Sequence, residues 1–417
     1  MELKPGYKRT EVGVIPEDWE VKPLGEMGNF KNGINKAIED FGYGSPFVNL
    51  MDVFGIPRAS ATTEGLGLIN TTEAERNAYA LRAGDVLFVR SSVKPQGVGL
   101  TTLIPSDLPE TVFSGFLIRF RSSGRLANQF KEHCFHGTGF RKRLIASSTV
   151  SANTNINQLA LSTLSIAFPP VIAEQHAIAT ALSDADALIT KLDQLIAKKR
   201  DIKQAAMQQL LTGKTRLPGF SGEWEVKRLG ALLKFQVGFP FSSRYFTSHT
   251  SGLRLVKNRD LKADDEVVYY DGPHHNDYVV SDGDILIGMD GDFLPCRWNK
   301  GVALLNQRVG RLYAAREVDL VFACYFLVGA LKEIERATSS TTVKHLSHGD
   351  VEGIQAFLPA LAEQTAIANV LSDLDAELAA LEARRDKMQA LKQGMMQVLL
   401  TGQVRLPVNK EPMEALA

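Results

Sequence analysis

Short polar motifs in the sequence resemble parts of catalytic sites, but each lacks the companion residues that its chemistry needs. Gly213-Lys214-Thr215 matches the end of a phosphate-binding loop, yet Gln208 stands where that loop needs a glycine, and a helix is predicted to end here rather than begin. Phe168-Pro169-Pro170-Val171 lacks the polar first residue and the aromatic last residue of the DNA amino-methyltransferase motif. The sequence contains no nucleophile elbow. We therefore expect that the chain is not an enzyme by itself.

Two further groups of residues have metal-ligating types, but their spacing favours other roles. The carboxylates of Asp282–Asp284 and Asp290–Asp292 alternate with glycines, which is typical of turns and leaves no spaced set of ligands. His133-Cys134-Phe135-His136 is too compressed for a zinc site without a second pair of ligands. We expect no metal site and no cofactor in this chain.

Composition limits the class of protein. At 417 residues the chain exceeds one ordinary hydrophobic core, so two to three domains are expected. It is 44% hydrophobic and 23% charged, without a signal-peptide pattern or an apolar run of about 18 residues, which argues against secretion and membrane insertion. Cys134, Cys296 and Cys324 are odd in number and far apart, which favours a reducing cytoplasm over a disulfide framework.

Net charge alone does not indicate nucleic-acid binding, because lysine plus arginine and aspartate plus glutamate both total 47. The distribution is uneven, however, because basic residues cluster within Lys131–Arg143 and again within Lys198–Lys203. A solvated surface is the default explanation for either cluster taken alone. Whether the clusters bind nucleic acid depends on where the fold places them.

A repeat identifies the elements that would position these residues. Residues 174–218 and 363–407 align without a gap at a shift of 189 residues, and 23 of their 45 positions are identical. Both copies begin Glu-Gln-x-Ala-Ile-Ala and end Leu-Leu-Thr-Gly-x-x-Arg-Leu-Pro. A period this long repeats a whole domain with its connector, not a solenoid unit.

Each copy is predicted to form one long helix. Apolar residues recur in steps of four and three, which is the spacing of a coiled-coil seam. Gly213 and Gly402 are suitable residues to terminate the helices, and a proline follows each glycine five residues later. The stretch from Pro170 to Thr212 is roughly 40 residues, so about 60 Å of helix. The seam residues are Ile178, Leu182, Ile189, Leu192 and Ile196 in the first copy and Ile367, Leu371, Leu374, Leu378 and Leu381 in the second.

An apolar stripe of this length needs a partner, and the simplest partner is the other copy. The first seam slips in phase beyond Ile196, and the second is interrupted by Arg385 and Lys392. Two separate helices, each packed on its own domain, are the alternative.

A second repeat precedes each helix. Ile15–Gly25 matches Phe220–Gly230 at a shift of 205 residues, around Trp19 and Trp224. Generic core aromatics would explain the tryptophans, but their repeated place beside a helix end favours a docking role. The segment expected after the second helix stands at the start of the chain, which predicts a closed, pseudo-two-fold arrangement. The predicted parts are a first globular domain (1–165), a first long helix (166–215), a second globular domain (216–354), a second long helix (355–407) and a tail (408–417).

The globular domains are predicted to be rich in β-strands, with short helices. In both, a Gly-Asp turn leads into an apolar run, at Ala83–Arg90 and Asp282–Gly288, which is typical of a buried strand. The polar loops between strands differ between the two domains, so they are the natural place for different contacts. Further strands are expected at Gly115–Arg121, Arg254–Lys257, Val267–Tyr270 and Val302–Leu305.

Together, these features resemble the specificity subunit of type I restriction–modification systems. The resemblance rests on the shared starts and ends of the helices and on the runs Arg216–Trp224 and Val14–Trp19, and it extends to the order of parts. It implies an α+β fold in which two β-rich target-recognition domains are joined by two long helices that form an antiparallel coiled coil. Each domain would read one half of a split DNA site, and the coiled coil would set the spacer between the halves.

The resemblance also implies partners. These are double-stranded DNA, two methyltransferase subunits and translocating endonuclease subunits, to which S-adenosylmethionine, ATP and magnesium would belong. Phosphate contacts would come from lysine and arginine, and base contacts from polar loop side chains. The candidate DNA-binding residues are Arg90, Ser92, Lys94, Gln96, Arg141, Lys142 and Arg143 in the first domain and Arg297, Asn299, Lys300, Arg308 and Lys344 in the second.

Two other functions stay open at this point. One is a coiled-coil protein-interaction scaffold without DNA recognition, which would show no salt-dependent binding of DNA. The other is a DNA-modifying enzyme with an unrecognised site, which would be active without partners. The balanced charge predicts modest affinity of the isolated chain for DNA.

Overall fold

The computed structural model describes residues 3–314, 317–337 and 344–407. Its internal contacts divide the chain into two compact units. Unit 1 contains the described residues up to Asp193 and those from Arg384 onward, and unit 2 contains Gln194–Ala383. The tail predicted at 408–417 lies outside the described residues.

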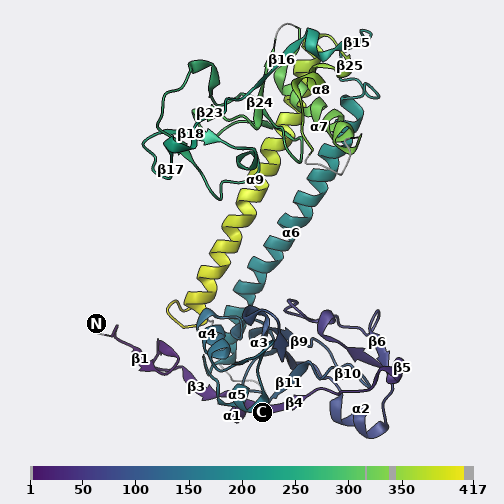
Figure 1. Ribbon diagram of the computed structural model, residues 1–417. Helices are drawn as coiled ribbons and strands as arrows, with labels where there is room; N and C mark the ends of the chain where they lie inside the picture. The colour runs from purple at the N-terminus through teal and green to yellow at the C-terminus, as the bar shows by residue number, and fades with distance from the viewer. Residues whose placement is uncertain (1–2, 315–316, 338–343, 408–417) are drawn as a thin grey trace. The chain divides into compact units, whose positions relative to one another are not determined.

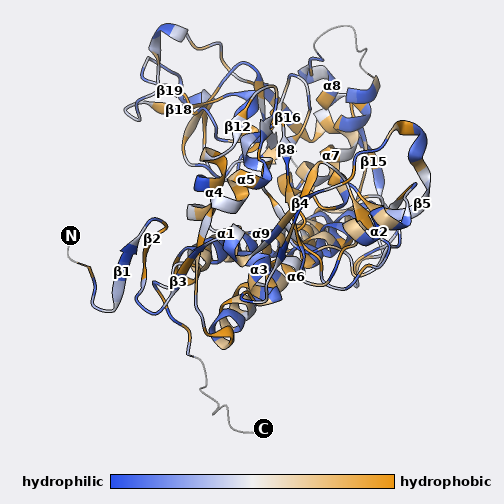
Figure 2. Ribbon diagram, turned by 90° about the horizontal axis from the view of Figure 1, so that it is seen from below, coloured by the Kyte–Doolittle hydropathy of each residue, from blue (hydrophilic) through white to orange (hydrophobic). Residues whose placement is uncertain are grey.

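Two long helices are the largest elements (Figure 1). Helix α6, Ile172–Leu210, and helix α9, Leu361–Leu399, each have 39 residues, as the repeat predicts. Figure 2, coloured by hydropathy, shows both hydrophobic and hydrophilic residues among the helices of the chain. Gly213 and Gly402 adopt φ values of 70° and 67°, a conformation that glycine tolerates best, so both helices end as predicted. The unit boundary falls inside both helices, so each unit holds the first part of one and the last part of the other.

Unit 1 is built on a four-stranded antiparallel sheet in the order β4-β11-β7-β9. The whole of β7, Val86–Val89, is buried. The turn before β7 has Gly84 at φ 84°, and the Asp85 carboxylate accepts a hydrogen bond from the Arg82 amide at 2.8 Å. The other strands of this sheet are β4 (Gly28–Asn32), β11 (Leu117–Ser122) and β9 (Thr101–Leu103).

The main core of unit 1 joins this sheet to the long helices. Phe88 and Phe120 from the sheet lie in one buried cluster with Ile178 of α6 and Leu399 of α9. The remaining elements of unit 1 are β1 (Tyr7–Thr10), β2 (Gly13–Pro16), β3 (Glu20–Pro23), α1 (Leu24–Met27), β5 (Phe41–Val48), β6 (Gly67–Ile69), α2 (Glu73–Tyr79), β8 (Ser91–Ser92), β10 (Val112–Phe113), α3 (Asn128–Cys134), α4 (Thr138–Ala146), β12 (Thr149–Val150), β13 (Thr154–Asn155), α5 (Gln158–Thr163) and β14 (Ser165–Phe168).

Unit 2 repeats the central sheet in the order β16-β24-β21-β22. Strand β21, Ile285–Gly288, is entirely buried like β7. Its turn is also built the same way, with Gly283 at φ 99° and the Asp284 carboxylate accepting from the Ser281 amide at 2.9 Å. The turn role predicted for Asp282–Asp284 is therefore confirmed. The predicted strands around 83–90, 115–121, 254–257, 267–270, 282–288 and 302–305 are confirmed at β7, β11, β18, β19, β21 and β23.

Unit 2 also holds a helix that the sequence analysis did not predict. Helix α7, Leu320–Ala337, has 18 residues, so the expectation of short helices alone is wrong here. Its buried Phe322, Leu327 and Leu331 join Ile367 and Leu371 of α9 in the core of unit 2. The remaining elements of unit 2 are β15 (Glu225–Arg228), β16 (Leu233–Val237), β17 (Phe246–Thr247), β18 (Leu253–Val256), β19 (Tyr269–Tyr270), β20 (Val279–Val280), β22 (Pro295–Arg297), β23 (Ala303–Leu305), β24 (Val309–Ala314), α8 (His348–Glu352) and β25 (Gln355–Leu358).

Candidate DNA interface and helix pair

The two long helices pair antiparallel within each unit. In unit 1 the ion pairs run Asp186–Lys392 and Asp193–Arg385, so residue numbers rise along α6 as they fall along α9. In unit 2 the pairs Lys199–Glu377 and Lys203–Asp375 follow the same order. Of the predicted seam residues, Ile178, Leu182, Leu192, Ile196, Ile367, Leu371 and Leu378 are buried and Ile189, Leu374 and Leu381 are half-buried.

The charged interruptions of the second seam are accounted for by acids on the other helix. Lys392 pairs with Asp186, and Arg385 lies 3.5 Å from Asp193 as well as beside its neighbour Asp386. A lysine or arginine on an apolar stripe lays its methylene stem along that stripe and keeps its charge at the edge. The interruptions are therefore part of the helix pairing.

The start of the chain docks onto the end of α9, as the displaced repeat predicts. Arg405, just beyond α9, bridges Glu174 at 2.5 Å and Asp18 at 2.9 Å. Trp19 is buried and donates its indole N–H to the same Glu174 carboxylate at 3.3 Å. The close approach also involves Gly402, where an added Cβ would lie 2.5 Å from Pro16. The docking role of Trp19 is confirmed.

Unit 2 contains the counterpart of this junction. Arg216, just beyond α6, forms two hydrogen bonds of 2.5 and 2.6 Å to the buried carboxylate of Glu363. Its guanidinium also lies over the ring of Trp224, 5.6 Å from the centroid. Among the described residues, the Trp224 indole N–H has no hydrogen-bond partner, whereas that of Trp19 has one. The two junctions share an arginine that pairs with a buried glutamate beside a tryptophan, but they do not share every contact.

The repeated glutamine at the start of each helix has a role that the sequence analysis missed. Gln175 accepts a hydrogen bond from the Ala127 amide at 2.7 Å and donates to the Pro169 carbonyl at 2.9 Å. Gln364 accepts from the Asp319 amide at 3.0 Å and donates to the Pro359 carbonyl at 2.9 Å. Each glutamine therefore ties its domain to its helix. The exact repetition of the glutamine in both copies was the signal in the sequence from which this role could have been predicted.

Three of the candidate DNA-binding residues of the first domain share one surface. Ser92, Lys94 and Gln96 line a concavity of about 710 Å³. Arg90 lies at the base of this loop, where it is half-buried and donates to the Gly115 carbonyl at 3.3 Å. The structure therefore brings together part of the predicted set.

The basic run at the end of Lys131–Arg143 divides into supporting and exposed residues. Arg141 donates to the carbonyls of Gln96 at 2.8 Å and Val98 at 2.7 Å, and Arg143 donates to the Ser165 carbonyl at 3.0 Å. Burial lowers the pKa of both guanidinium groups from its ordinary value. Lys142 is exposed. Arg141 and Arg143 thus support the loop and a strand, and Lys142 is the residue of this run that faces solvent.

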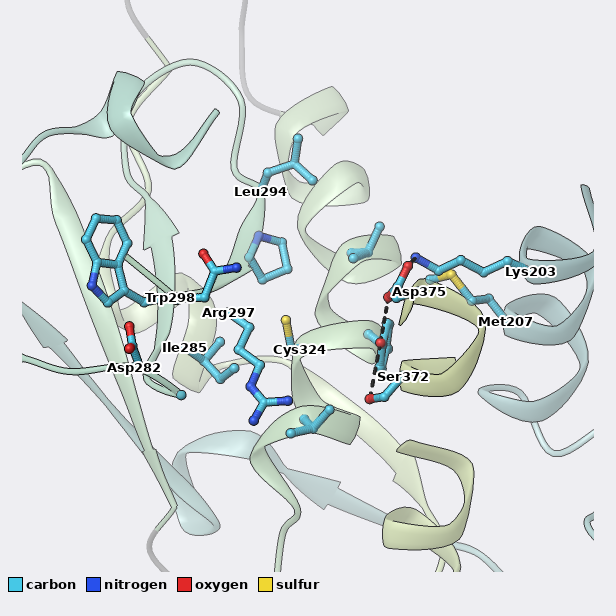
Figure 3. Close-up of a pocket in the computed structure, with 16 residues that line it drawn as sticks. Lys203, Met207, Asp282, Ile285, Leu294, Arg297, Trp298, Cys324, Ser372 and Asp375 are labelled. Atoms are coloured by element: carbon cyan, nitrogen blue, oxygen red, sulfur yellow. Dashed lines mark hydrogen bonds and ion pairs between the residues drawn. The ribbon is translucent and has the colours of Figure 1, made fainter. Parts of the chain in front are cut away.

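In the second domain, Arg297 and Asn299 line a cavity of about 750 Å³ (Figure 3). Cys324 and Tyr325 of α7 form another part of its wall, and the Tyr325 hydroxyl donates to Asp375 at 2.6 Å. Burial, together with this hydrogen bond, raises the pKa of Tyr325 above its ordinary value. The cavity therefore combines apolar walls with charged residues on two sides, Asp282 and Arg297 on one and Lys203 and Asp375 on the other.

The three remaining candidates of the second domain have acidic or carbonyl partners. Lys300 donates to the Asp260 carbonyl at 2.8 Å and to Asp264 at 2.7 Å. Arg308 pairs with Asp290 at 3.2 Å, and Lys344 lies 3.6 Å from Glu335. These ion pairs are partly exposed, so DNA phosphates could compete with the acids at a small cost in free energy.

Two histidines of unit 1, His133 and His136, are held as neutral hydrogen-bonding groups. His133 lies 3.0 Å from the Ser183 hydroxyl and His136 lies 2.9 Å from that of Thr101. Burial lowers the pKa of each imidazole to about 4. Within residues 3–314, 317–337 and 344–407, no group of three or more His, Cys, Asp and Glu side chains is placed to hold a metal ion. In the same part of the chain, no helix has the length and hydropathy needed to cross a bilayer.

Comparison with known proteins identifies the same pattern. The model of the type I restriction modification DNA specificity domain matches the chain twice, over residues 16–200 and 221–390. The putative type I restriction enzyme MjaX specificity subunit of Methanocaldococcus jannaschii is 26% identical over 96% of this chain and 97% of that protein. The type I restriction enzyme EcoBI specificity subunit of Escherichia coli is 35% identical over 42% of this chain and 37% of that protein.

Solved structures are similar in fold. The crystal structure of a type I restriction–modification S subunit from M. genitalium superposes with a TM-score of 0.60 at 15% identity, covering 96% of this chain and 98% of that one. A chain from a study of the assembly and conformational transition of the type I restriction–modification system gives 0.55 at 16% identity, covering 94% and 99%. Because the two domain matches together span most of the sequence, the chain belongs to the type I restriction modification DNA specificity family.

Proposed function

We propose that this chain is the specificity subunit of a type I restriction–modification complex, that each of its two domains recognises one half of a bipartite DNA site, and that α6 and α9 set the spacer. The observation that carries the proposal is the double domain match, in which each match takes in one β-rich domain and most of the long helix that follows it. Two domains that match the same family model but differ in their loops are suited to recognise two different short DNA sequences. A scaffold without DNA recognition is not favoured.

The partners follow from the same proposal. Double-stranded DNA, two methyltransferase subunits and endonuclease subunits would assemble on this chain, which would be non-catalytic itself. S-adenosylmethionine, ATP and magnesium would belong to those partners.

A domain exchange tests the proposal. The chain is co-expressed with its methyltransferase partner, and methylated adenines are mapped across the host DNA. Replacing residues 216–350 by those of a related subunit should change one half of the methylated motif and leave the other half unchanged. Replacing residues 1–165 is the matched control and should change the opposite half. A change in both halves from either exchange contradicts independent recognition.

Binding by the isolated chain gives a second test. Equal totals of basic and acidic residues predict weak binding of the isolated chain to duplex DNA, with an affinity that falls steeply between 50 mM and 200 mM salt. Fluorescence anisotropy with labelled duplex, with and without the methyltransferase subunits, measures this. Tight binding that is insensitive to salt would contradict the proposal, and no binding even with the partners would favour a scaffold.

A further inference from the structure

The concavity that holds Ser92, Lys94 and Gln96 has an apolar floor. Met51, Phe54, Val93 and Phe116 line it and are 78%, 41%, 81% and 57% exposed, respectively. These four residues are called the apolar surface below. Large apolar side chains that gather at one exposed place mark an interaction site more often than chance exposure does.

The rim of the apolar surface is polar and carries a single charge. Ser92, Gln96 and Asn153 supply hydroxyl and amide groups, and Lys94 supplies the charge. None of the residues that line the concavity is acidic. This combination suits an anionic partner that presents an apolar group among hydrogen-bonding groups.

The backbone around the apolar surface is held in place before any partner arrives. Strand β8 pairs with β13, with Ser92 opposite Thr154, and Arg141 holds the carbonyls of Gln96 and Val98. Gly97 allows the chain to pass so close that an added Cβ would lie 2.2 Å from the Ser92 hydroxyl oxygen. A preorganised loop loses little conformational freedom on binding, which suits discrimination between similar ligands.

The second domain presents different chemistry after the equivalent strand. Where β7 is followed by Ser92 and Val93, β21 is followed by Asp290 and Asp292. Asp290 pairs with Arg308 and His345, and Asp292 pairs with Lys262. One domain therefore offers an apolar floor where the other offers charge.

Resting on the proposed function, we propose that the apolar surface reads the C5-methyl group of thymine in the major groove of the first domain's half-site. Thymine is the only standard base whose edge in that groove carries a methyl group, and apolar side chains are the groups that contact it. Gln96 and Ser92 then meet the neighbouring hydrogen-bonding edges, and Lys94 meets a phosphate. The half-site read by the first domain must therefore contain at least one A·T pair whose methyl group is covered.

Deoxyuridine scanning tests the inference, because deoxyuridine keeps thymine's hydrogen-bonding groups and lacks only the methyl group. The complex with methyltransferase subunits binds labelled duplexes that carry the mapped site, with each thymine of either half-site replaced in turn. We expect about four-fold weaker binding at one or more positions in the first domain's half-site, the effect of one buried methyl-sized group. In the second domain's half-site we expect no such methyl dependence.

Variants separate this surface from other causes. Val93→Ser should weaken binding to the thymine duplex. On the deoxyuridine duplex, Val93→Ser should lower the affinity little further, because the substitution in the protein and the loss of the methyl group remove the same contact. Val226→Ser, an exposed valine of the second domain, is the matched control and should leave both affinities unchanged. Retained site-specific binding with no methyl dependence in the first half-site overturns the inference while leaving the proposed function intact. If Val93→Ser no longer assembles with the methyltransferase subunits but keeps its normal DNA preference, the inference is overturned in favour of a protein interface. If the unmodified complex shows no site-specific binding at all, the proposed function itself is refuted.

Discussion

Lys392 of α9 pairs with Asp186 of α6, and the residues 189 positions away, Lys203 and Asp375, form the same pair with the helices exchanged. The repeat in sequence is thus a repeat in contacts. The two pairs differ in one respect, because Asp375 also accepts a hydrogen bond from the Tyr325 hydroxyl of α7. This difference makes a matched comparison of the two carboxylates informative.

Asp375→Ala should destabilise the protein more than Asp186→Ala. Both changes remove one partly exposed ion pair, which contributes little, but only the first leaves the half-buried Tyr325 hydroxyl without this acceptor. We expect a difference of about 1 kcal/mol in the free energy of unfolding. Urea denaturation followed by circular dichroism measures it. In the Tyr325→Phe background the two alanine variants should become equivalent, and a difference that persists there would show that Tyr325 is not its source.

Arg405→Ala should loosen the start of the chain. The change leaves the buried Glu174 carboxylate with one hydrogen bond from Trp19, and Asp18 loses its bidentate partner. We expect a melting temperature lower by several degrees and faster cleavage by trypsin after Lys8 and Arg9, because a buried carboxylate without its cation is costly. Arg405→Lys is the control and should recover only part of the loss, since lysine cannot bridge two carboxylates with a planar fork. Unchanged cleavage in Arg405→Ala would argue that the other contacts of the junction, such as those of Trp19 and Tyr7, are enough to hold it.

The long elements were predictable because they repeat. The Glu-Gln starts, the Leu-Leu-Thr-Gly ends and the tryptophan before each helix occur twice. The helices, their pairing and the docking of the start of the chain could therefore be inferred from the sequence alone. The Gly-Asp turns ahead of β7 and β21 were predictable for a different reason, since a glycine followed by an apolar run is a strong local signal. Helix α7 was missed, because it belongs to no repeat and its first eleven residues are nearly all apolar, a pattern that does not separate a buried helix from a strand.

The candidate interface was less predictable, because residue type does not reveal a side chain's partners. Arg141 and Arg143 have the type expected of phosphate contacts, yet their guanidinium groups bind backbone carbonyls of the protein. Val93 and Phe116 have the type expected of a core, yet both are largely exposed. In both cases the deciding fact is how the fold places segments distant in sequence, which either engages a side chain or leaves it exposed and which no local pattern encodes.

Arg141→Ala and Lys142→Ala should therefore have different effects although the residues are adjacent. Arg141→Ala removes the donors that hold the Gln96 and Val98 carbonyls, so it should lower stability by about 1–3 kcal/mol and weaken the preference for the specific site. Lys142→Ala should leave stability unchanged and, if Lys142 meets a phosphate, should reduce the slope of log affinity against log salt by about one. Thermal unfolding and anisotropy titrations at several salt concentrations separate the two. Equal loss of stability in both variants would contradict the division of this run into supporting and exposed residues.

Shortening both helices together should shorten the spacer of the recognised site. Leu195–Asp201 and Glu377–Ala383 are seven-residue segments that contain both partners of the Lys199–Glu377 and Arg200–Glu382 pairs. Removing seven residues from each helix preserves the seam's phase and takes away about 10 Å of rise, which corresponds to about three base pairs of duplex. We expect methylated motifs with unchanged halves and a spacer about three base pairs shorter, measured by mapping methylated adenines. Deleting only Leu195–Asp201 is the control and should abolish methylation. The two helices then differ in length by one heptad, so residues that pair across the seam on one side of the deletion no longer face each other. An unchanged spacer in the double deletion would mean that the helices do not set the distance.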